Sequence, residues 1–136
     1  METNKADFCA CGSDKTYIDC CGRYLDNGEI PQSAEILMRS RYTAYTLGRE
    51  DYLLATWYSD VRPEALELFG SDHQWLGLDV KRHVQTGPYH AIVEFVAYYQ
   101  VDGHKHSLHE VSRFLFEGGR WFYVDGEFIQ QNQATE

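Results

Sequence analysis

Four cysteines near the start of the chain are the residues most suited to chemistry. They are Cys9, Cys11, Cys20 and Cys21, in the spacing C-x-C-x8-C-C. Gly12 and Ser13 follow the first pair, so the eight-residue connection can fold back, and they can aim backbone N–H groups at the sulfurs. Four thiolates in a tetrahedron suit Zn²⁺ at bond lengths of about 2.3 Å, and iron also accepts four sulfurs. We predict a structural metal site with no open coordination position.

The spacing alone leaves other interpretations of these cysteines open. They could form disulfides or remain ordinary thiols, although a bridge between adjacent Cys20 and Cys21 would be strained. A redox-responsive thiol switch is a further hypothesis. It predicts thiols that react readily even in the metal-loaded protein, whereas a closed zinc site would protect them.

Composition and charge exclude several classes of protein. The chain has 136 residues, 43% of them hydrophobic, which excludes a disordered chain and fits one compact domain with a small appendage. A net charge of −9 would repel a phosphate backbone, so we expect neither a nucleic-acid nor a membrane partner. Residues 1–7 lack the apolar run of a signal peptide, and we expect a cytoplasmic location.

The chain divides into an N-terminal unit, residues 1–24, and a larger domain, residues 25–136. A helix is predicted from an N-cap at Ser33 to a stop at Gly48, because apolar residues recur at helical spacing between them. Residues 51–58 predict a second helix. A third is expected to begin at Pro63 and to end at Gly70.

After residue 70 the apolar period changes to that of strands. Four strands are predicted at 76–81, 89–101, 105–117 and 120–125. The turns between them are Gly87-Pro88, Asp102-Gly103 and Gly118-Gly119. Helices followed by an antiparallel meander indicate an α+β fold. Both faces of the second strand carry apolar residues, so one face should pack on the helices and the other could form a homodimer.

Glu110 shares a strand face with apolar residues, so it should be either paired or functional. We favour a structural ion pair with Arg39 or Arg41. The alternative is a cavity with aromatic walls, in which Glu110 is an acid or base. Its expected residues are Tyr45, Trp57, Glu110 and Trp121.

Two histidine patterns do not predict metal sites. The segment His109-Glu110-x-x-Arg113 lacks the second histidine of a zinc-protease helix and reads as a strand. His104, His106 and His109 lie beside a predicted hairpin turn, and we expect them to be solvated.

Several longer motifs support a family resemblance. The run Cys9-Ala10-Cys11-Gly12-Ser13, with Tyr17 and Cys20-Cys21-Gly22, resembles the SEC-C metal-binding motif, which also occurs at the tail of the protein-export ATPase SecA. Further blocks resemble the bacterial YchJ-like family across nearly the whole chain. They are Arg23-Tyr24-Leu25-Asp26, Leu37-Met38-Arg39-Ser40-Arg41-Tyr42-Thr43-Ala44-Tyr45, Tyr52-Leu53-Leu54-Ala55-Thr56-Trp57, His109-Glu110-Val111-Ser112-Arg113-Phe114 and Trp121-Phe122-Tyr123-Val124-Asp125-Gly126.

The resemblance implies a SEC-C knuckle followed by a cone-shaped domain like nuclear transport factor 2 (NTF2-like). SEC-C units elsewhere are associated with the chaperone SecB or the ribosome. This chain departs from the usual pattern, with Ala10 in place of proline and with Asp14, Thr16 and Asp19 in a connection that is elsewhere basic. The sequence therefore names no particular partner.

Taken together, these observations predict a zinc-binding cytoplasmic protein, without enzymatic activity, that works by protein binding. The four-cysteine unit would be its recognition element. The alternative is a small-molecule-binding domain or enzyme that uses the cavity of the larger domain.

Overall fold

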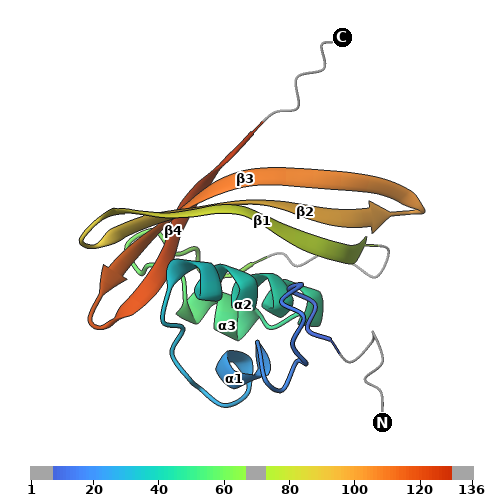
Figure 1. Ribbon diagram of the computed structural model, residues 1–136. Helices are drawn as coiled ribbons and strands as arrows, with labels where there is room; N and C mark the ends of the chain where they lie inside the picture. The colour runs from blue at the N-terminus through green and yellow to red at the C-terminus, as the bar shows by residue number, and fades with distance from the viewer. Residues whose placement is uncertain (1–7, 67–72, 130–136) are drawn as a thin grey trace.

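A computed structural model describes residues 8–66 and 73–129 (Figure 1). The helices are α1 (Gly22–Leu25), α2 (Ala34–Leu47) and α3 (Glu50–Ala55). The strands are β1 (His73–Gly87), β2 (His90–Val101), β3 (His104–Glu117) and β4 (Arg120–Phe128). They form one antiparallel sheet in the order β1-β2-β3-β4, with all three helices on one side of it (Figure 1). The predicted α+β fold is confirmed.

Helix α2 has the predicted ends. The Ser33 hydroxyl accepts a hydrogen bond from the backbone N–H of Ile36 at 3.1 Å, which caps the first turn. Gly48 ends the helix in the left-handed conformation, with φ of 70°. Because α2 lies under the sheet, most of its surface is buried.

Tight hairpin turns join β2 to β3 and β3 to β4 at the positions that the sequence predicts. Asp102 and Gly103 have φ values of 51° and 82°, and Gly118 and Gly119 have values of 63° and 87°. Two successive positive φ values match the twist of the flanking strands, which fixes the pairing of β2 with β3 and of β3 with β4.

Many of the core residues that the sheet contributes lie in the middle of β2. Ala91, Val93, Phe95 and Ala97 are buried on the face that meets the helices. On the opposite face Tyr98 is 40% exposed. The prediction that one face packs on the helices is confirmed. The sheet bends over α2, so its concave side faces that helix (Figure 1).

Four predicted boundaries are wrong or incomplete. The strand expected at 76–81 runs from His73 to Gly87, because it pairs with β2 along that whole length. The helix expected over 51–58 ends at Ala55, because Thr56 and Tyr58 instead exchange backbone hydrogen bonds with Tyr123 of β4. No helix begins at Pro63, at least as far as Leu66, and its expected end at Gly70 lies outside the described residues. The last strand continues through Gly126 to Phe128, since Ser112 of β3 pairs with Gly126.

One short element was not predicted from the sequence. Helix α1 follows Cys21 directly, in a segment whose apolar content is too low to reveal a helical period. In the described ranges, no helix is both long enough and apolar enough to cross a lipid bilayer.

Candidate metal centre and cavity

The first two cysteines lie on a tight hairpin. Phe8 and Thr16 form an antiparallel bridge, and the N–H of Cys9 donates to the carbonyl of Lys15 at 2.7 Å. Gly12 turns the chain with φ of 82°, which a glycine adopts without strain. This fold-back, predicted from Gly12 and Ser13, brings Cys9 and Cys11 close together. We call residues 8–24 the knuckle.

The second pair is presented by a turn that leads into α1. The N–H of Gly22 donates to the carbonyl of Tyr17 at 2.8 Å. A Cβ at position 22 would lie only 2.8 Å from that oxygen, so the close approach requires glycine. Cys20 and Cys21 consequently sit at the start of α1 with their sulfurs directed at the first pair.

The four sulfurs are positioned to hold one metal ion. All four Sγ atoms lie within 4.8 Å of one another, with 3.5 Å between Cys11 and Cys20 and 4.0 Å between Cys20 and Cys21. Tetrahedral bonds of about 2.3 Å would place the sulfurs about 3.8 Å apart, so the donor set fits such an ion. All four cysteines are free thiols, which excludes the disulfide interpretation for this structure.

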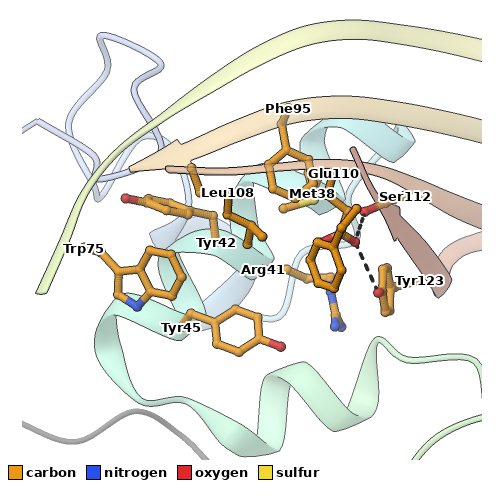
Figure 2. Close-up of a pocket in the computed structure, with 12 residues that line it drawn as sticks. Met38, Arg41, Tyr42, Tyr45, Trp75, Phe95, Leu108, Glu110, Ser112 and Tyr123 are labelled. Atoms are coloured by element: carbon orange, nitrogen blue, oxygen red, sulfur yellow. Dashed lines mark hydrogen bonds between the residues drawn. The ribbon is translucent and has the colours of Figure 1, made fainter. Parts of the chain in front are cut away.

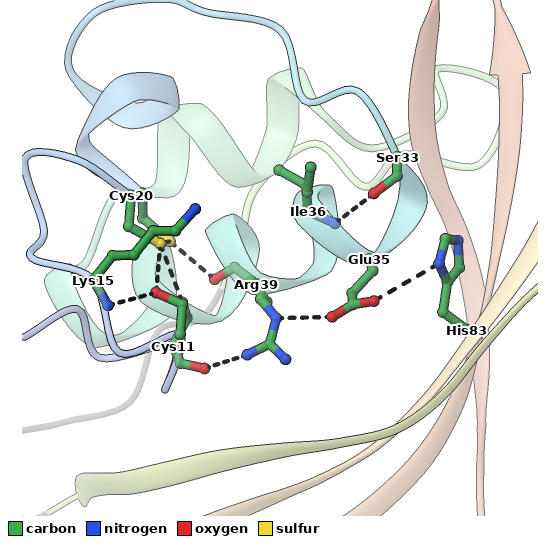
Figure 3. A network of polar contacts seen from close by, with 10 residues as sticks. Cys11, Lys15, Cys20, Ser33, Glu35, Ile36, Arg39 and His83 are labelled. Atoms are coloured by element: carbon green, nitrogen blue, oxygen red, sulfur yellow. Dashed lines mark hydrogen bonds and ion pairs between the residues drawn. The ribbon is translucent and has the colours of Figure 1, made fainter.

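Helix α2 supports the sulfurs from one side (Figure 3). The hydroxyl of Thr43 donates to Cys21 Sγ at 3.2 Å and lies 3.7 Å from Cys9 Sγ. Arg39 Nη1 donates to the carbonyl of Cys11 at 2.7 Å. From within the knuckle, the Ser13 hydroxyl lies 3.0 Å from Cys20 Sγ. Cys21 Sγ also donates to the carbonyl of Arg39 at 3.5 Å, and backbone N–H groups of Cys11 and Cys21 donate to Cys9. Backbone N–H groups therefore do contact a sulfur, but those described belong to the cysteines and not to Gly12 or Ser13.

Crowding separates the acidities of these thiols. Hydrogen bonds from Cys11 and Cys21 hold the pKa of Cys9 far below its usual value. The neighbouring Cys11 and Cys9 sulfurs, together with burial, raise the pKa of Cys21. Cys11, between the opposing effects of Cys21 and Cys9 and subject to burial, has its pKa raised to about 11. One negative charge is easily placed in this cluster, and further charges need a cation to stabilise them.

A separate cavity of about 240 Å³ lies between α2 and the concave face of the sheet (Figure 2). Most of its wall is aromatic or aliphatic, and its two charged groups, Arg41 and Glu110, lie on one side together with Ser112 and Tyr123 (Figure 2). The lining residues are Met38, Arg41, Tyr42, Tyr45, Trp75, Phe95, Ala97, Leu108, Glu110, Ser112, Tyr123 and Phe128.

Glu110 is the acidic group of this cavity. Its Oε2 accepts hydrogen bonds from the Ser112 hydroxyl at 2.7 Å and the Tyr123 hydroxyl at 3.4 Å. Burial raises its pKa, and the two hydroxyl groups oppose that effect. Gly126 of β4 makes the room, because a Cβ there would lie 1.8 Å from Glu110 Oε2.

The ion pair that we expected for Glu110 is not formed. Arg41 Nη1 instead donates to the carbonyl of Leu53 at 2.8 Å and to the Thr56 hydroxyl at 2.7 Å. Its guanidinium lies over the Tyr123 ring, 4.4 Å from the centroid. Arg39 pairs with Glu35 at 3.1 Å and faces the knuckle. Helical geometry explains the difference, because residues two apart point to different sides of α2.

The structure brings only part of the expected cavity set together. Tyr45 and Glu110 line the cavity. Trp57 instead packs edge-to-face on Tyr123 at a centroid distance of 4.9 Å, and Trp121 packs in the same way on Phe116 at 5.2 Å.

The three histidines near the hairpin have different surroundings, and the expectation that all three are solvated is wrong for His109. His109 Nε2 lies 2.7 Å from Glu94 Oε2, and His106 stacks on Tyr99 at 5.2 Å. His104 is exposed. The four cysteines are the one group of potential metal ligands found among the described residues.

Two functional residues were not predicted from the sequence. Thr43 contacts two of the sulfurs, and Gly126 leaves the space that the Glu110 carboxyl occupies. A threonine within a buried helical face signals a polar partner, but nothing local identifies the partner as Cys21, 22 residues earlier. A glycine inside a strand signals close approach of another group, and the carboxyl of Glu110 is that group.

Comparison with known proteins agrees with this geometry. The family model of the YchJ middle NTF2-like domain matches residues 33–126. A UPF0225 protein from Methylibium petroleiphilum is 50% identical over 119 residues, covering 88% of this chain and 87% of that protein. One from Bordetella pertussis is 49% identical over 121 residues, covering 88% and 91%.

Two solved structures are also similar. One is the solution structure of a SEC-C motif containing protein from Rhodopseudomonas palustris, with a TM-score of 0.77 and 36% identity, covering 90% of this chain and 98% of that one. The other is the crystal structure of a SEC-C motif containing protein from Psychrobacter arcticus, with a TM-score of 0.72 and 26% identity, covering 90% and 83%.

Replacing Thr43 with valine tests its support of the sulfurs. The shape is kept and the hydroxyl that donates to Cys21 is lost, so affinity for a divalent metal should fall about tenfold to a hundredfold. Competition with a chromophoric chelator measures the change. Thr46→Val is the matched control, because the Thr46 hydroxyl donates to the Thr43 carbonyl and not to a sulfur. Equal affinities for the two variants would contradict the assignment.

Replacing Gly126 with alanine tests the seat of Glu110. The added methyl group collides with the carboxyl, and the free energy of unfolding should fall by about 1–3 kcal/mol in urea titrations. Gly77→Ala in β1 is the control, since nothing lies within 4 Å of its added Cβ. The extra penalty should disappear when Glu110→Ala is present in the same chain. A Gly126→Ala cost no larger than that of Gly77→Ala would refute this account.

Proposed function

The chain belongs to the YchJ-like family of UPF0225 proteins, and we propose that it is a cytoplasmic protein-binding adaptor whose knuckle is held in shape by one zinc ion. The observation that carries the proposal is the convergence of four free sulfurs within 4.8 Å on a segment too short to fold by itself. Four thiolates fill a tetrahedral site, so a bound ion would stabilise structure and leave no position for a substrate. Such an ion would replace the hydrophobic core that the knuckle lacks.

The outer surface of the knuckle supports a role in binding. A groove of about 330 Å³ runs beside Cys20, the one sulfur of the four that is not fully buried. Three cations, from Lys15, Arg23 and Arg39, and one carboxylate, from Asp19, lie along it. Arg23 pairs with Glu29 and Arg39 with Glu35, whereas Lys15 has no ion pair among the described residues. Glu29, Glu35 and Asp19 offset most of the positive charge along the groove, so Lys15 is the cation best placed to meet a carboxylate of a partner segment.

An exposed apolar side chain lies on the same unit. Ile18 is 75% exposed on the turn between the two cysteine pairs. An apolar contact beside a charged groove is the usual composition of a small protein-binding surface. Ordering of this turn depends on both cysteine pairs, which links metal binding to recognition.

Metal content tests the first half of the proposal. Protein purified without added metal should contain one zinc ion per chain by elemental analysis. Its four thiols should react with a thiol reagent only after a chelator is added, because a closed site protects them. Iron in place of zinc would contradict the choice of metal. Thiols that react readily in the metal-loaded protein would favour the redox switch instead.

Site-specific crosslinking tests the second half. A photoreactive residue placed at Lys15 should give a discrete crosslinked product in bacterial cells, and one placed at Glu117, at the end of β3, should not. Arg23→Glu should reduce that product about tenfold by reversing a groove charge. Arg113→Glu is the matched control, because Arg113 is also an exposed arginine in an ion pair, but on the sheet.

Sequencing of the crosslinked product should place an acidic segment of the partner at residue 15. Products that are the same from both positions, or that are equally sensitive to both arginine substitutions, would refute the groove as the binding surface.

A further inference from the structure

Two charged side chains in the cavity have hydrogen-bonding atoms without a partner. Arg41 is 3% exposed and Glu110 is 9% exposed, and both line the cavity. Among the described residues, only Nη1 of Arg41 and only Oε2 of Glu110 make hydrogen bonds. Nε and Nη2 of Arg41 therefore remain as donors, and Oε1 of Glu110 remains as an acceptor. None of these three atoms is sealed inside the protein, so they open onto the cavity, where a ligand can pair with them.

The charges at this end of the cavity balance. No carboxylate of the described residues lies within 4.0 Å of the Arg41 guanidinium. Glu110, which lines the same cavity, supplies the opposite charge (Figure 2). Burial raises the pKa of Glu110, and the hydrogen bonds donated by Ser112 and Tyr123 and the charge of Arg41 oppose that effect and favour the ionised form. An anionic ligand would meet the Glu110 charge and a cationic ligand would meet that of Arg41. An uncharged ligand disturbs neither.

The remaining walls select for a ring. Tyr42, Tyr45 and Trp75 line one part of the cavity, and Leu108 and Phe95 line another (Figure 2). These side chains offer apolar contact and no further charge. A volume of about 240 Å³ has room for one substituted ring but not for a molecule of several fused rings.

We infer that this cavity binds an uncharged, single-ring molecule with an amide-like end, whose carbonyl accepts from Arg41 and whose N–H donates to Glu110 Oε1. The ring lies against the aromatic wall and the polar end lies between the two charged groups. This site is separate from the knuckle, and its existence does not depend on the proposed adaptor role.

A series of probes of one shape tests the inference. Benzamide, benzoate, benzamidine and acetophenone share a ring and differ in the charge and the donors of the end group. Each is titrated into the full metal-loaded chain at pH 8, and backbone amide shifts are followed by NMR at Ser112, Gly126 and Tyr45. Benzamide should bind at least tenfold more tightly than each of the other three, because each of those leaves one buried group unpaired or opposed.

Glu110→Gln gives the decisive variant. The hydroxyl groups of Ser112 and Tyr123 hold the amide oxygen of glutamine where Oε2 was, so its NH₂ group faces the cavity as a donor. Benzamide binding should weaken about tenfold, and benzoate should become the tightest ligand, because Arg41 and Gln at 110 then both donate to it. Glu94→Gln, on the opposite face of the sheet, should leave the wild-type order unchanged.

Three results would overturn the inference. One is benzoate or benzamidine binding wild type at least as tightly as benzamide does. Another is that no probe, at a concentration on the order of 10 mM, changes the amide chemical shifts of the cavity residues. A dissociation constant of roughly that size is the weakest that a specific site for one ring should show. The third is a Glu94→Gln variant that changes the order as Glu110→Gln does. None of these results bears on the zinc content or the crosslinks of the knuckle, so the two proposals fail separately.

Discussion

Helix α2 packs against two different polar environments at once, and the rest of the structure depends on this packing. Thr43 and Arg39 meet the cysteine cluster on one side, and Arg41 and Tyr45 meet the cavity on another. A helix presents successive residues about 100° apart, so neighbouring positions serve different surfaces. The cap at Ser33 and the stop at Gly48 fix the length of α2, and through it the relative positions of knuckle and sheet.

The cysteine cluster is a structural solution to the small size of the knuckle. A segment of this length cannot bury enough apolar surface to order its backbone, and it relies on hairpin bonds, contacts to α2 and a set of four sulfurs. The divergent thiol acidities show why the sulfurs suit a cation: one negative charge is well stabilised, and the next ones are opposed by it. Burial by α2 then limits the access of solvent to three of the four sulfurs.

The cavity follows a different logic. Burying Glu110 and Arg41 near an apolar wall costs solvation energy, and the fold offsets only part of that cost with hydroxyl, carbonyl and ring contacts. Gly126 shows that the sheet is shaped around the carboxyl, since any side chain there would displace it. An all-apolar core would be the cheaper way to fill the space under a sheet. The two opposite charges instead open onto the cavity, and this is the observation on which the inferred ligand site is based.

The sequence by itself determined the elements whose signals are local. Capping residues, helical spacing and two-residue turns predicted α2, the hairpins and the presence of four strands, because these depend on contacts between residues a few positions apart. The full length of β1 was not predicted, since it follows from pairing with β2. The cysteine spacing predicted that the sulfurs meet, since a short connection with Gly12 can close on itself. Tertiary structure alone decided that Thr43 supports Cys21, that Arg41 turns to Leu53 and Thr56 and not to Glu110, and that Gly126 lies beneath Glu110. Those contacts join separate elements, and their geometry is set by the register of the sheet and the rotation of α2, which no local pattern specifies.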